Sequence, residues 1–591
     1  MGWNWDTPPG APQRSFIKAV ARKGLTGFVV GAVSLGAAWA GVGLTPVDDV
    51  VSDQGEGSVR PGPEDDRVVA TGDAEGSPAS EGFDLEALAA GDGQVLAGAA
   101  RVSIEPRPGD YGGTWETENC KTFGEDAPAA ATHVADFRVR WPENSNCIYM
   151  GGYGIGPMNP ITSWEDPYGL WIRSVALSDG EDTLVLTLLD GVYWEAEYNS
   201  MCDGCGFFDL QKWGAEEFGV SEDSFMFAST HSHTSPDFIG GWGGVPDWYM
   251  EQVTDSFKAS VTGAMESLRP AILETGESIV RERNSERRDF YRSAEEETFT
   301  WFRAIDASDQ PRPEVCTTPT PEPAPSPTKK PKRSASPSPT PAPTPVCEPG
   351  SPGKAIATVG AYAAHPVTAD EGAGIADADF PAVFASEVEA DFGGVGAFFQ
   401  TGLGNISPRG DKVTMGQGLA SYVPAIGQGR TVATPDVRVK QERWDQPVTN
   451  TVLGSLGATG FFDRTMNETP ATVSAGKNGE RKCHSASPIS VNTGVTAAKV
   501  GSLWITGGPG ELFSNLTNTI KERNPGGVTM PLGLVNDGLG YIVQSFETDH
   551  AGRQGTGFVG APLAEYEDAY SIDHCFGDKV LETTIGLLGG L

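Results

Sequence analysis

The chain has 591 residues, and its 42 Lys and Arg against 79 Asp and Glu give a formal net charge of −37 at pH 7. This acidity argues against a nucleic-acid-binding protein, because a phosphate backbone is neutralised by basic side chains. It also argues against adhesion to an anionic membrane surface by charge alone.

The N-terminal region has the features of an export segment. Basic residues occur up to Lys23, and residues 24–44 then carry no charge and contain the small-x-small sequence Ala38-Trp39-Ala40. The same run is long enough to span a bilayer, so residues 1–44 are either a signal peptide or an uncleaved membrane anchor. Both alternatives predict an extracellular or cell-envelope protein, secreted or tethered to the membrane.

The cysteines agree with an oxidising compartment, because an even number, 8, favours disulfides in an exported protein. Successive cysteines bracket loop-like segments, which favours pairing of neighbours. The expected bridges are Cys120–Cys147, Cys202–Cys205, Cys316–Cys347 and Cys483–Cys575. The alternative for Cys202-Asp-Gly-Cys205 is a redox or zinc-binding Cys-x-x-Cys, and a structural clip is favoured because no second Cys-x-x-Cys occurs.

Two stretches have the composition of solvated linkers. Residues 45–93 are rich in Gly, Asp, Glu, Ser and Pro and poor in aromatic residues, which predicts a disordered acidic spacer. Residues 311–352 are dominated by Pro, Thr, Ser and Ala, which predicts a polyproline-like disordered insertion. We expect this insertion to interrupt the sequence of one catalytic domain, 94–591, without dividing its fold.

Strand-like runs alternate with helix candidates along this domain. Strands are expected at 99–104, 171–177, 183–189, 225–228, 355–361, 395–399 and 503–506, and helices at 247–268, 382–392 and 511–523. Alternation over this length predicts an α/β fold with a sizeable core.

Several residues suited to catalysis or metal binding follow these strands. His231 and His233 come after the fourth strand, His365 after the fifth, Ser407 after the sixth and Glu511 after the last. In open α/β sheets, sites gather at the carboxyl ends of the strands. Zinc favours imidazole nitrogen and carboxylate oxygen, so the histidines and the glutamate together predict a zinc site. Any one histidine alone could simply bond within its own loop.

The segments around these residues resemble the neutral/alkaline, non-lysosomal ceramidase family. Thr230-His-Ser-His-Thr-Ser-Pro236 is similar to its Thr-His-Thr-His-Ser-Gly-Pro, and Ala364-His-Pro-Val367 is similar to its His-Pro segment. Gly404-Asn-Ile-Ser-Pro408 resembles its Gly-Asp-Val-Ser-Pro-Asn, and Gly508-Pro-Gly-Glu511 resembles its Pro-Gly-Glu-Phe. These motifs occur in the family's order between about residues 97 and 575.

The resemblance implies a mixed-sheet α/β zinc hydrolase that cleaves an N-acyl amide, with a ceramide-like lipid as the favoured substrate. His231, His365 and Glu511 would hold zinc. His233 would face the scissile carbonyl, and Ser407 would lie at the reaction centre, either attacking the substrate or positioning it.

The chain also departs from the family. A tyrosine that closes the family's last motif supplies its fourth ligand, whereas Asp573 stands at that position here, with Tyr570 as the alternative ligand. Asn405 and Arg409 replace an aspartate and an asparagine, and the chain ends soon after Cys575, where we expect no immunoglobulin-like domain. Two other functions therefore stay open: a zinc esterase or amidase for a non-lipid substrate, and a non-catalytic surface protein on a retired hydrolase scaffold.

Overall fold

The computed structural model describes residues 68–70, 94–122, 146–153, 156–164, 166–288, 295–311, 315–317, 346–348, 353–458, 462–476, 483–524, 526–548 and 566–591. The export segment expected over 1–44 lies outside them. None of the helices within these ranges is both long and apolar enough to cross a membrane.

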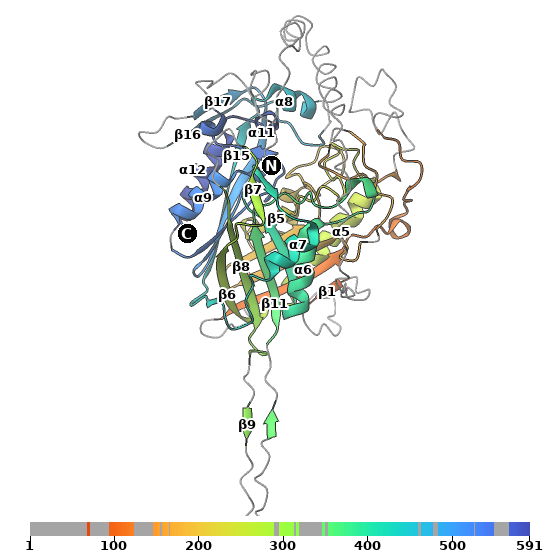
Figure 1. Ribbon diagram of the computed structural model, residues 1–591. Helices are drawn as coiled ribbons and strands as arrows, with labels where there is room; N and C mark the ends of the chain where they lie inside the picture. The colour runs from red at the N-terminus through yellow and green to blue at the C-terminus, as the bar shows by residue number, and fades with distance from the viewer. Residues whose placement is uncertain are drawn as a thin grey trace, which may run out of the picture.

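A large mixed sheet forms the centre of the molecule (Figure 1). Its main strands are, in spatial order, β12 (Val395–Gln400), β11 (Ala355–Tyr362), β8 (Thr298–Asp306), β6 (Arg269–Ile279), β2 (Val95–Ser103), β3 (Trp171–Ser178), β4 (Thr183–Leu189) and β5 (Phe225–Ser229). The β11–β12 and β4–β5 pairs are parallel, and the other pairs along this order are antiparallel. The prediction of an α/β fold with a mixed sheet is confirmed.

A second sheet packs against one face of the first. Its strands are, in order, β15 (Val437–Pro447), β18 (Ser490–Val500), β19 (Leu503–Gly507) and β21 (Val528–Leu532). Alternation along β4 shows the layering, because successive side chains of a strand point to opposite faces. Leu186 shares a buried cluster with Ile505 of the second sheet, whereas Val185 shares another with Phe257 on the helical side.

Helices cover the two outer faces and complete four layers (Figure 1). The large sheet is covered by α4 (Phe207–Phe218), α5 (Asp247–Glu266) and α6 (Asp379–Phe392), with α7 (Lys412–Ala420) packed on α6. The second sheet is covered by α9 (Ser514–Arg523) and α12 (Phe576–Leu588).

Shorter elements connect these layers. The helices among them are η2 (Pro108–Tyr111), η5 (Glu222–Ser224), η6 (Glu371–Ala373), α8 (Thr451–Ala458), α10 (Ser545–Thr548) and α11 (Tyr566–Ala569). The paired short strands are β7 (Asn284–Glu286) with β13 (Ile406–Pro408), β16 (Ala471–Ala475) with β17 (Cys483–Ser487), and β20 (Glu511–Leu512) with β22 (Tyr541–Ile542). A further strand, β14 (Arg430–Thr431), pairs with β6.

Some expected boundaries need correction. The helix expected over 511–523 begins only at Ser514, because Glu511 belongs to β20. Within the expected spacer 45–93, β1 (Val68–Ala70) pairs with β2. Within the expected insertion 311–352, β9 (Val315–Thr317) and β10 (Val346–Glu348) form an antiparallel pair. Most of both stretches lies outside the described residues.

The cysteine pairing follows the expected order of neighbours. Disulfides join Cys120 to Cys147, Cys202 to Cys205 and Cys483 to Cys575. The strand register of β9 and β10 sets Cys316 opposite Cys347, as the fourth expected bridge requires. In this bridged state the sulfurs of Cys202 and Cys205 are not thiolate ligands.

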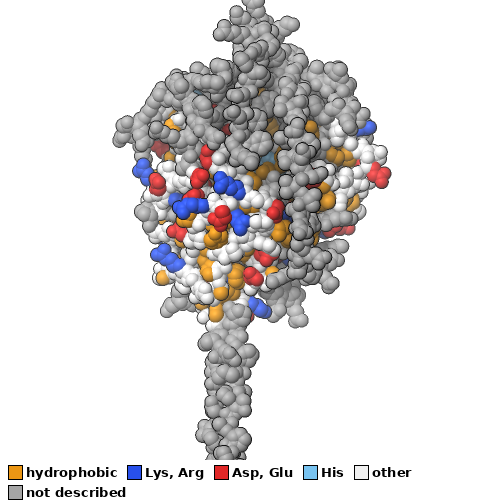
Figure 2. Space-filling view, viewed as in Figure 1, with side chains coloured by type: hydrophobic (Ala, Val, Ile, Leu, Met, Phe, Trp, Pro, Cys, Tyr) orange, Lys and Arg blue, Asp and Glu red, His pale blue; other side chains and the backbone are white. Residues whose placement is uncertain are grey.

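The negative charge is not gathered on the face drawn in Figure 2, where Lys and Arg side chains lie among Asp and Glu. Arg281 and Glu297, for example, form an exposed ion pair at 2.9 Å. Such pairs each contribute little to stability.

Close contact between α5 and β2 yields a stability prediction. A Cβ added at Gly98 of β2 would lie 2.1 Å from the carbonyl oxygen of Ala264 and 2.8 Å from the amide nitrogen of Leu268. Backbone atoms cannot rotate away, so the helix must shift. We expect Gly98→Ala to lower the free energy of unfolding by about 1–3 kcal/mol. Gly109→Ala, where the added Cβ has nothing within 4 Å, is the control. Identical urea midpoints for both variants would contradict this packing.

Candidate metal centre

Strand β5 delivers His231 to the site through a constrained turn. The residue has a left-handed backbone (φ 65°), which is uncommon for a side-chain-bearing residue, and its amide donates to the Gly191 carbonyl at 2.8 Å. Its Nδ1 lies 3.0 Å from the carbonyl oxygen of Val192. Because that oxygen can only accept, Nδ1 carries the hydrogen, and Nε2 keeps its lone pair.

His365 reaches the same point from the end of β11. Its Nδ1 lies 3.0 Å from the carbonyl oxygen of Ile406, so its Nε2 also keeps a lone pair. That Nε2 lies 3.0 Å from Oε2 of Glu511, and Nε2 of His231 lies 3.6 Å from the same oxygen. All three side chains are buried.

These three atoms form a cluster of acceptors. Two imidazole lone pairs and a carboxylate oxygen repel one another in a buried place unless a cation lies between them. A single proton satisfies one pair of them, whereas a divalent metal satisfies all three. Two imidazole nitrogens and one carboxylate are a donor set that zinc accepts, so the residues present fit a zinc ion.

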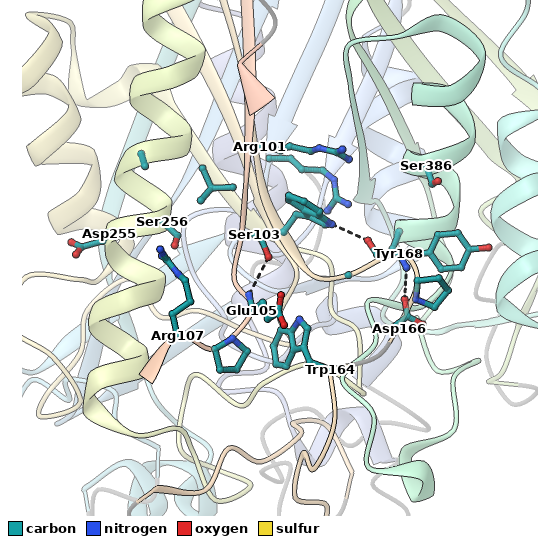
Figure 3. Close-up of a pocket in the computed structure, with 18 of the residues that line it drawn as sticks. Arg101, Ser103, Glu105, Arg107, Trp164, Asp166, Tyr168, Asp255, Ser256 and Ser386 are labelled. Atoms are coloured by element: carbon teal, nitrogen blue, oxygen red, sulfur yellow. Dashed lines mark hydrogen bonds between the residues drawn. The ribbon is translucent and has the colours of Figure 1, made fainter. Parts of the chain in front are cut away.

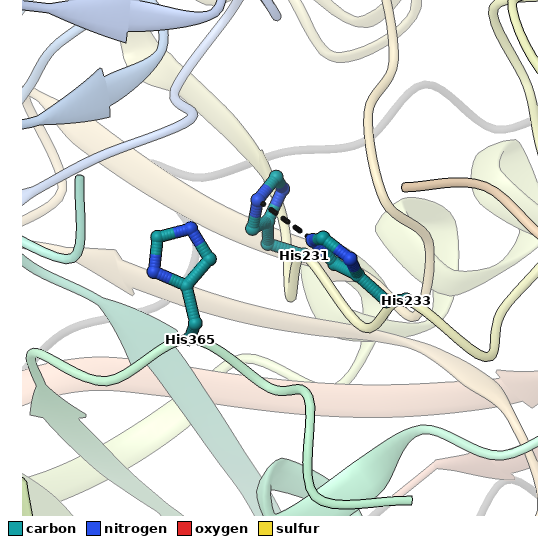
Figure 4. Close-up of side chains that lie close together, drawn as sticks. All are labelled: His231, His233 and His365. Atoms are coloured by element: carbon teal, nitrogen blue, oxygen red, sulfur yellow. Dashed lines mark hydrogen bonds between the residues drawn. The ribbon is translucent and has the colours of Figure 1, made fainter. Parts of the chain in front are cut away.

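His233 completes the group of three histidines (Figure 4). Its Nε2 lies 3.3 Å from Nε2 of His231, which has no hydrogen to give, so the His233 nitrogen is the donor. Its Nδ1 is therefore a bare acceptor, and that atom is buried without a hydrogen-bond partner among the described residues. The ring packs edge-on against Tyr153, with centroids 4.8 Å apart.

The turn that carries the two histidines is anchored by Asp377, which lies just before α6. The hydroxyls of Ser232 and Thr234 donate to the carbonyl oxygen of Asp377 at 2.7 and 2.9 Å. The Asp377 carboxylate is in turn paired with Lys412 at 2.5 Å, and Lys412 also contacts Asp166 at 2.7 Å. These contacts fix the turn on both sides of His233.

Ser407 is linked to the cluster through its neighbour Ile406, and Asn405 contacts the start of α9. Ser407 directly follows Ile406, whose carbonyl holds the ring of His365, and it is half-buried in β13. The Asn405 side chain accepts from the Ser514 amide at 2.9 Å and donates to the Ser514 hydroxyl at 2.8 Å. Asn405, which stands where the family has an aspartate, therefore holds the first residue of α9 through two hydrogen bonds.

The structure does not bring Asp573 to the histidines. Its carboxylate accepts from the Thr449 hydroxyl at 2.7 Å, the Ser485 hydroxyl at 3.0 Å and the Cys575 amide at 2.8 Å, and none of these partners belongs to the cluster. These three donors satisfy the carboxylate at the start of α12. The Tyr570 side chain is 36% exposed.

Tyr541 and Tyr193 are the site residues that the sequence did not single out. The Tyr541 hydroxyl accepts from Arg287 at 3.0 Å, and its proximity to the Glu511 carboxylate acts to lower the pKa of that group. The Tyr193 hydroxyl donates to the other oxygen of Glu511. The parallel pairing of β20 with β22 sets Tyr541 opposite Glu511. The sequence signal was the segment 534–541, which only loosely approximates a tyrosine-containing segment of the ceramidase family.

Burial keeps the histidines in the form that binds a metal. Loss of hydration lowers the pKa of His231 to about 4 and that of His365 to about 3. Both rings are therefore neutral at pH 7. Burial raises the pKa of Glu511, and the nearby His231 acts in the opposite direction.

Comparison by sequence and comparison by structure give different results. The sequence matches no protein-family model and no curated protein. The fold matches the crystal structure of neutral ceramidase from Pseudomonas aeruginosa at 14% identity, with a TM-score of 0.51, over 84% of this chain and 74% of that one. A ceramidase complexed with C2 matches over the same shares at 13% identity and a TM-score of 0.50. The chain therefore has a ceramidase-like fold.

The low histidine pKa values predict how stability depends on pH in the metal-free protein. An unfolded histidine has a pKa near 6.5, so below that pH the unfolded chain binds a proton that folded His365 excludes. The free energy of unfolding should then fall by about 1 kcal/mol per pH unit below pH 6.5 for each such histidine. His365→Gln should flatten the profile, measured by urea unfolding with a chelator present. Glu511 is present in both the unchanged protein and the His365→Gln variant, so its own titration affects the two profiles alike. Parallel profiles would contradict a neutral, buried His365.

Proposed function

We propose that this protein is a zinc-dependent hydrolase that cleaves an N-acyl amide bond, with a ceramide-like lipid as its leading substrate. The observation that carries the proposal is the meeting of three acceptors, Nε2 of His231, Nε2 of His365 and Oε2 of Glu511, in a buried place. The fold likeness to ceramidases supports the reaction class and the lipid substrate.

His231, His365 and Glu511 would hold the metal, and we propose Tyr541 as the fourth ligand in place of Asp573. The support is that the pairing of β20 with β22 sets Tyr541 opposite Glu511, whereas the Asp573 carboxylate accepts from three other donors. When bound, zinc supplies a Lewis acid that polarises a carbonyl or acidifies a water.

The remaining residues would move the proton and orient the substrate. The His233 ring, whose Nε2 faces the proposed ligand His231, is proposed to take a proton as the nucleophile attacks and to return it to the leaving amine. Ser407, next to the carbonyl that holds His365, is proposed to lie at the reaction centre.

We also propose that the protein is exported. The uncharged run 24–44 after a basic flank supports this, as do the three disulfides described above. Export would place the centre outside the cytoplasm, where lipid amides of membranes or debris are its substrates.

Metal analysis of purified variants tests the ligand set. His231→Ala and His365→Ala should each abolish bound zinc, because too few donors remain. Tyr541→Phe should weaken zinc affinity about 10-fold or more, whereas Asp573→Asn, the control, should retain it. Zinc titration followed by mass spectrometry of the bound metal measures both. Zinc loss in Asp573→Asn but not in Tyr541→Phe would reverse the assignment.

Turnover assays on the same preparations test the reaction. Ser407→Ala should keep zinc and lose most turnover of a short-chain fluorescent ceramide. N-acyl amino acids and simple esters, assayed in parallel, identify the substrate class. A zinc-loaded protein that hydrolyses only simple esters would contradict the amidase, and one that hydrolyses none of these would contradict the hydrolase.

Gly152 gives a separate test of His233. A Cβ added at Gly152 would lie 2.4 Å from Cγ and Nδ1 of the His233 ring. Gly180 has nearly the same backbone (φ 92° against 95°) and nothing within 4 Å of an added Cβ, so Gly180→Ala matches the strain without the contact. We expect Gly152→Ala to keep zinc and to lower turnover about 10-fold or more relative to Gly180→Ala. Equal turnover in the two variants would exclude the proposed role of His233.

A further inference from the structure

A second cavity, of about 630 Å³, lies apart from the metal centre, and none of the three histidines or Glu511 lines it. It lies between α5 and α6, with β2 and β3 behind it (Figure 3). Its volume is within the range of small-molecule sites. The proposed hydrolase chemistry gives this cavity no role.

Aromatic side chains form much of its wall. Tyr111, Trp164, Tyr168 and Trp171 line the cavity and are all partly exposed. The indole nitrogen of Trp171 donates to the carbonyl oxygen of Tyr168 at 2.8 Å, which fixes these two residues relative to each other. Arg101, Lys412 and Arg107 lie over one face of Trp171, Tyr168 and Tyr111, respectively, so the opposite faces and the ring edges are what these rings offer to a flat C–H surface.

The charges deep in the wall are already matched. Arg101 pairs with Glu389 at 2.5 Å, and Arg173 pairs with Asp190 at 2.6 Å, with all four side chains largely buried. An ionic ligand would therefore find no uncompensated counter-charge among these four groups. Arg101, Arg173 and Glu389 also line the cavity, and their polar atoms can form hydrogen bonds with a neutral ligand that carries many hydroxyls.

Buried polar atoms in the wall lack partners. The Trp164 indole nitrogen, the Ser256 hydroxyl and Nε of Arg173 have no hydrogen-bond partner among the described residues, although Ser256 is only 2% exposed and Arg173 3%. Figure 3 shows Ser256 on the α5 side, beside Arg107, and Trp164 next to Glu105. Buried polar groups are normally satisfied, and these three atoms have less than 1 Å² of exposed surface each, so oxygen atoms of a ligand would reach them when the wall side chains shift.

We propose that this cavity is a binding site for a neutral saccharide. A sugar ring presents an apolar C–H face to the aromatic side chains and hydroxyls on its edge. Those hydroxyls both donate and accept, which suits a wall that holds guanidinium, carboxylate, indole and hydroxyl groups together. The site would hold the protein on a glycan-bearing surface and does not depend on the metal centre.

Filling the cavity tests the proposal. Ser386 lines it from α6 and is half-buried, so Ser386→Trp should occupy it, and Ala259→Trp should do so from α5. Ala390→Trp adds the same side chain at an exposed position of α6 outside the cavity and is the matched control. Zinc content and melting temperature check that each variant is folded.

Binding of cellotriose, chitotriose and maltotriose to the full chain would be measured by saturation-transfer NMR and calorimetry. We expect saturable binding of at least one of them, weakened about 10-fold or more in a folded cavity-filling variant and unchanged in Ala390→Trp. Absence of binding by all three would overturn the proposal, as would full binding by both filled variants. Binding restricted to an anionic oligosaccharide such as a hyaluronan tetrasaccharide would overturn the neutral class.

Discussion

The site depends on one electrostatic constraint: two imidazole lone pairs face the same buried carboxylate oxygen, Oε2 of Glu511, at 3.0 Å from His365 and 3.6 Å from His231. Hydrogen bonds from Nδ1 to the carbonyl oxygens of Val192 and Ile406 fix both rings with their lone pairs facing inward. Burial opposes protonation of the rings, so the cluster is rich in acceptors and is suited to a cation.

Both sheets contribute to this arrangement. β5 and β12 lie at opposite ends of the order of the large sheet, yet Gln400, at the end of β12, donates to the carbonyl oxygen of Thr230, just after β5, at 3.2 Å. From the second sheet, the chain after β21 bonds to β5 through the Asn536 side chain and the Phe227 amide at 2.8 Å. The strand ends that carry the ligands therefore converge because the sheet edges are joined there.

The sequence predicted what is local. The apolar run that forms β4 predicts the bounds of that strand. The polar side chains that follow the expected strands predict that His231, His365 and Glu511 are neighbours, as the structure has them. The pairing of β20 with β22, which sets Tyr541 beside Glu511, joins segments distant in sequence and leaves no periodic signal. Motif resemblance pointed instead to Asp573, whose carboxylate serves local donors. β15 was missed because its exposed positions interrupt the apolar pattern.

The most direct test of the account is the location of the metal itself. Crystals of the intact protein grown with zinc would be measured on both sides of the zinc absorption edge. The account predicts an anomalous peak about 2.0–2.2 Å from Nε2 of His231, Nε2 of His365 and an oxygen of Glu511. An anomalous peak at Asp573, or none at the three acceptors in crystals that contain stoichiometric zinc, would contradict it.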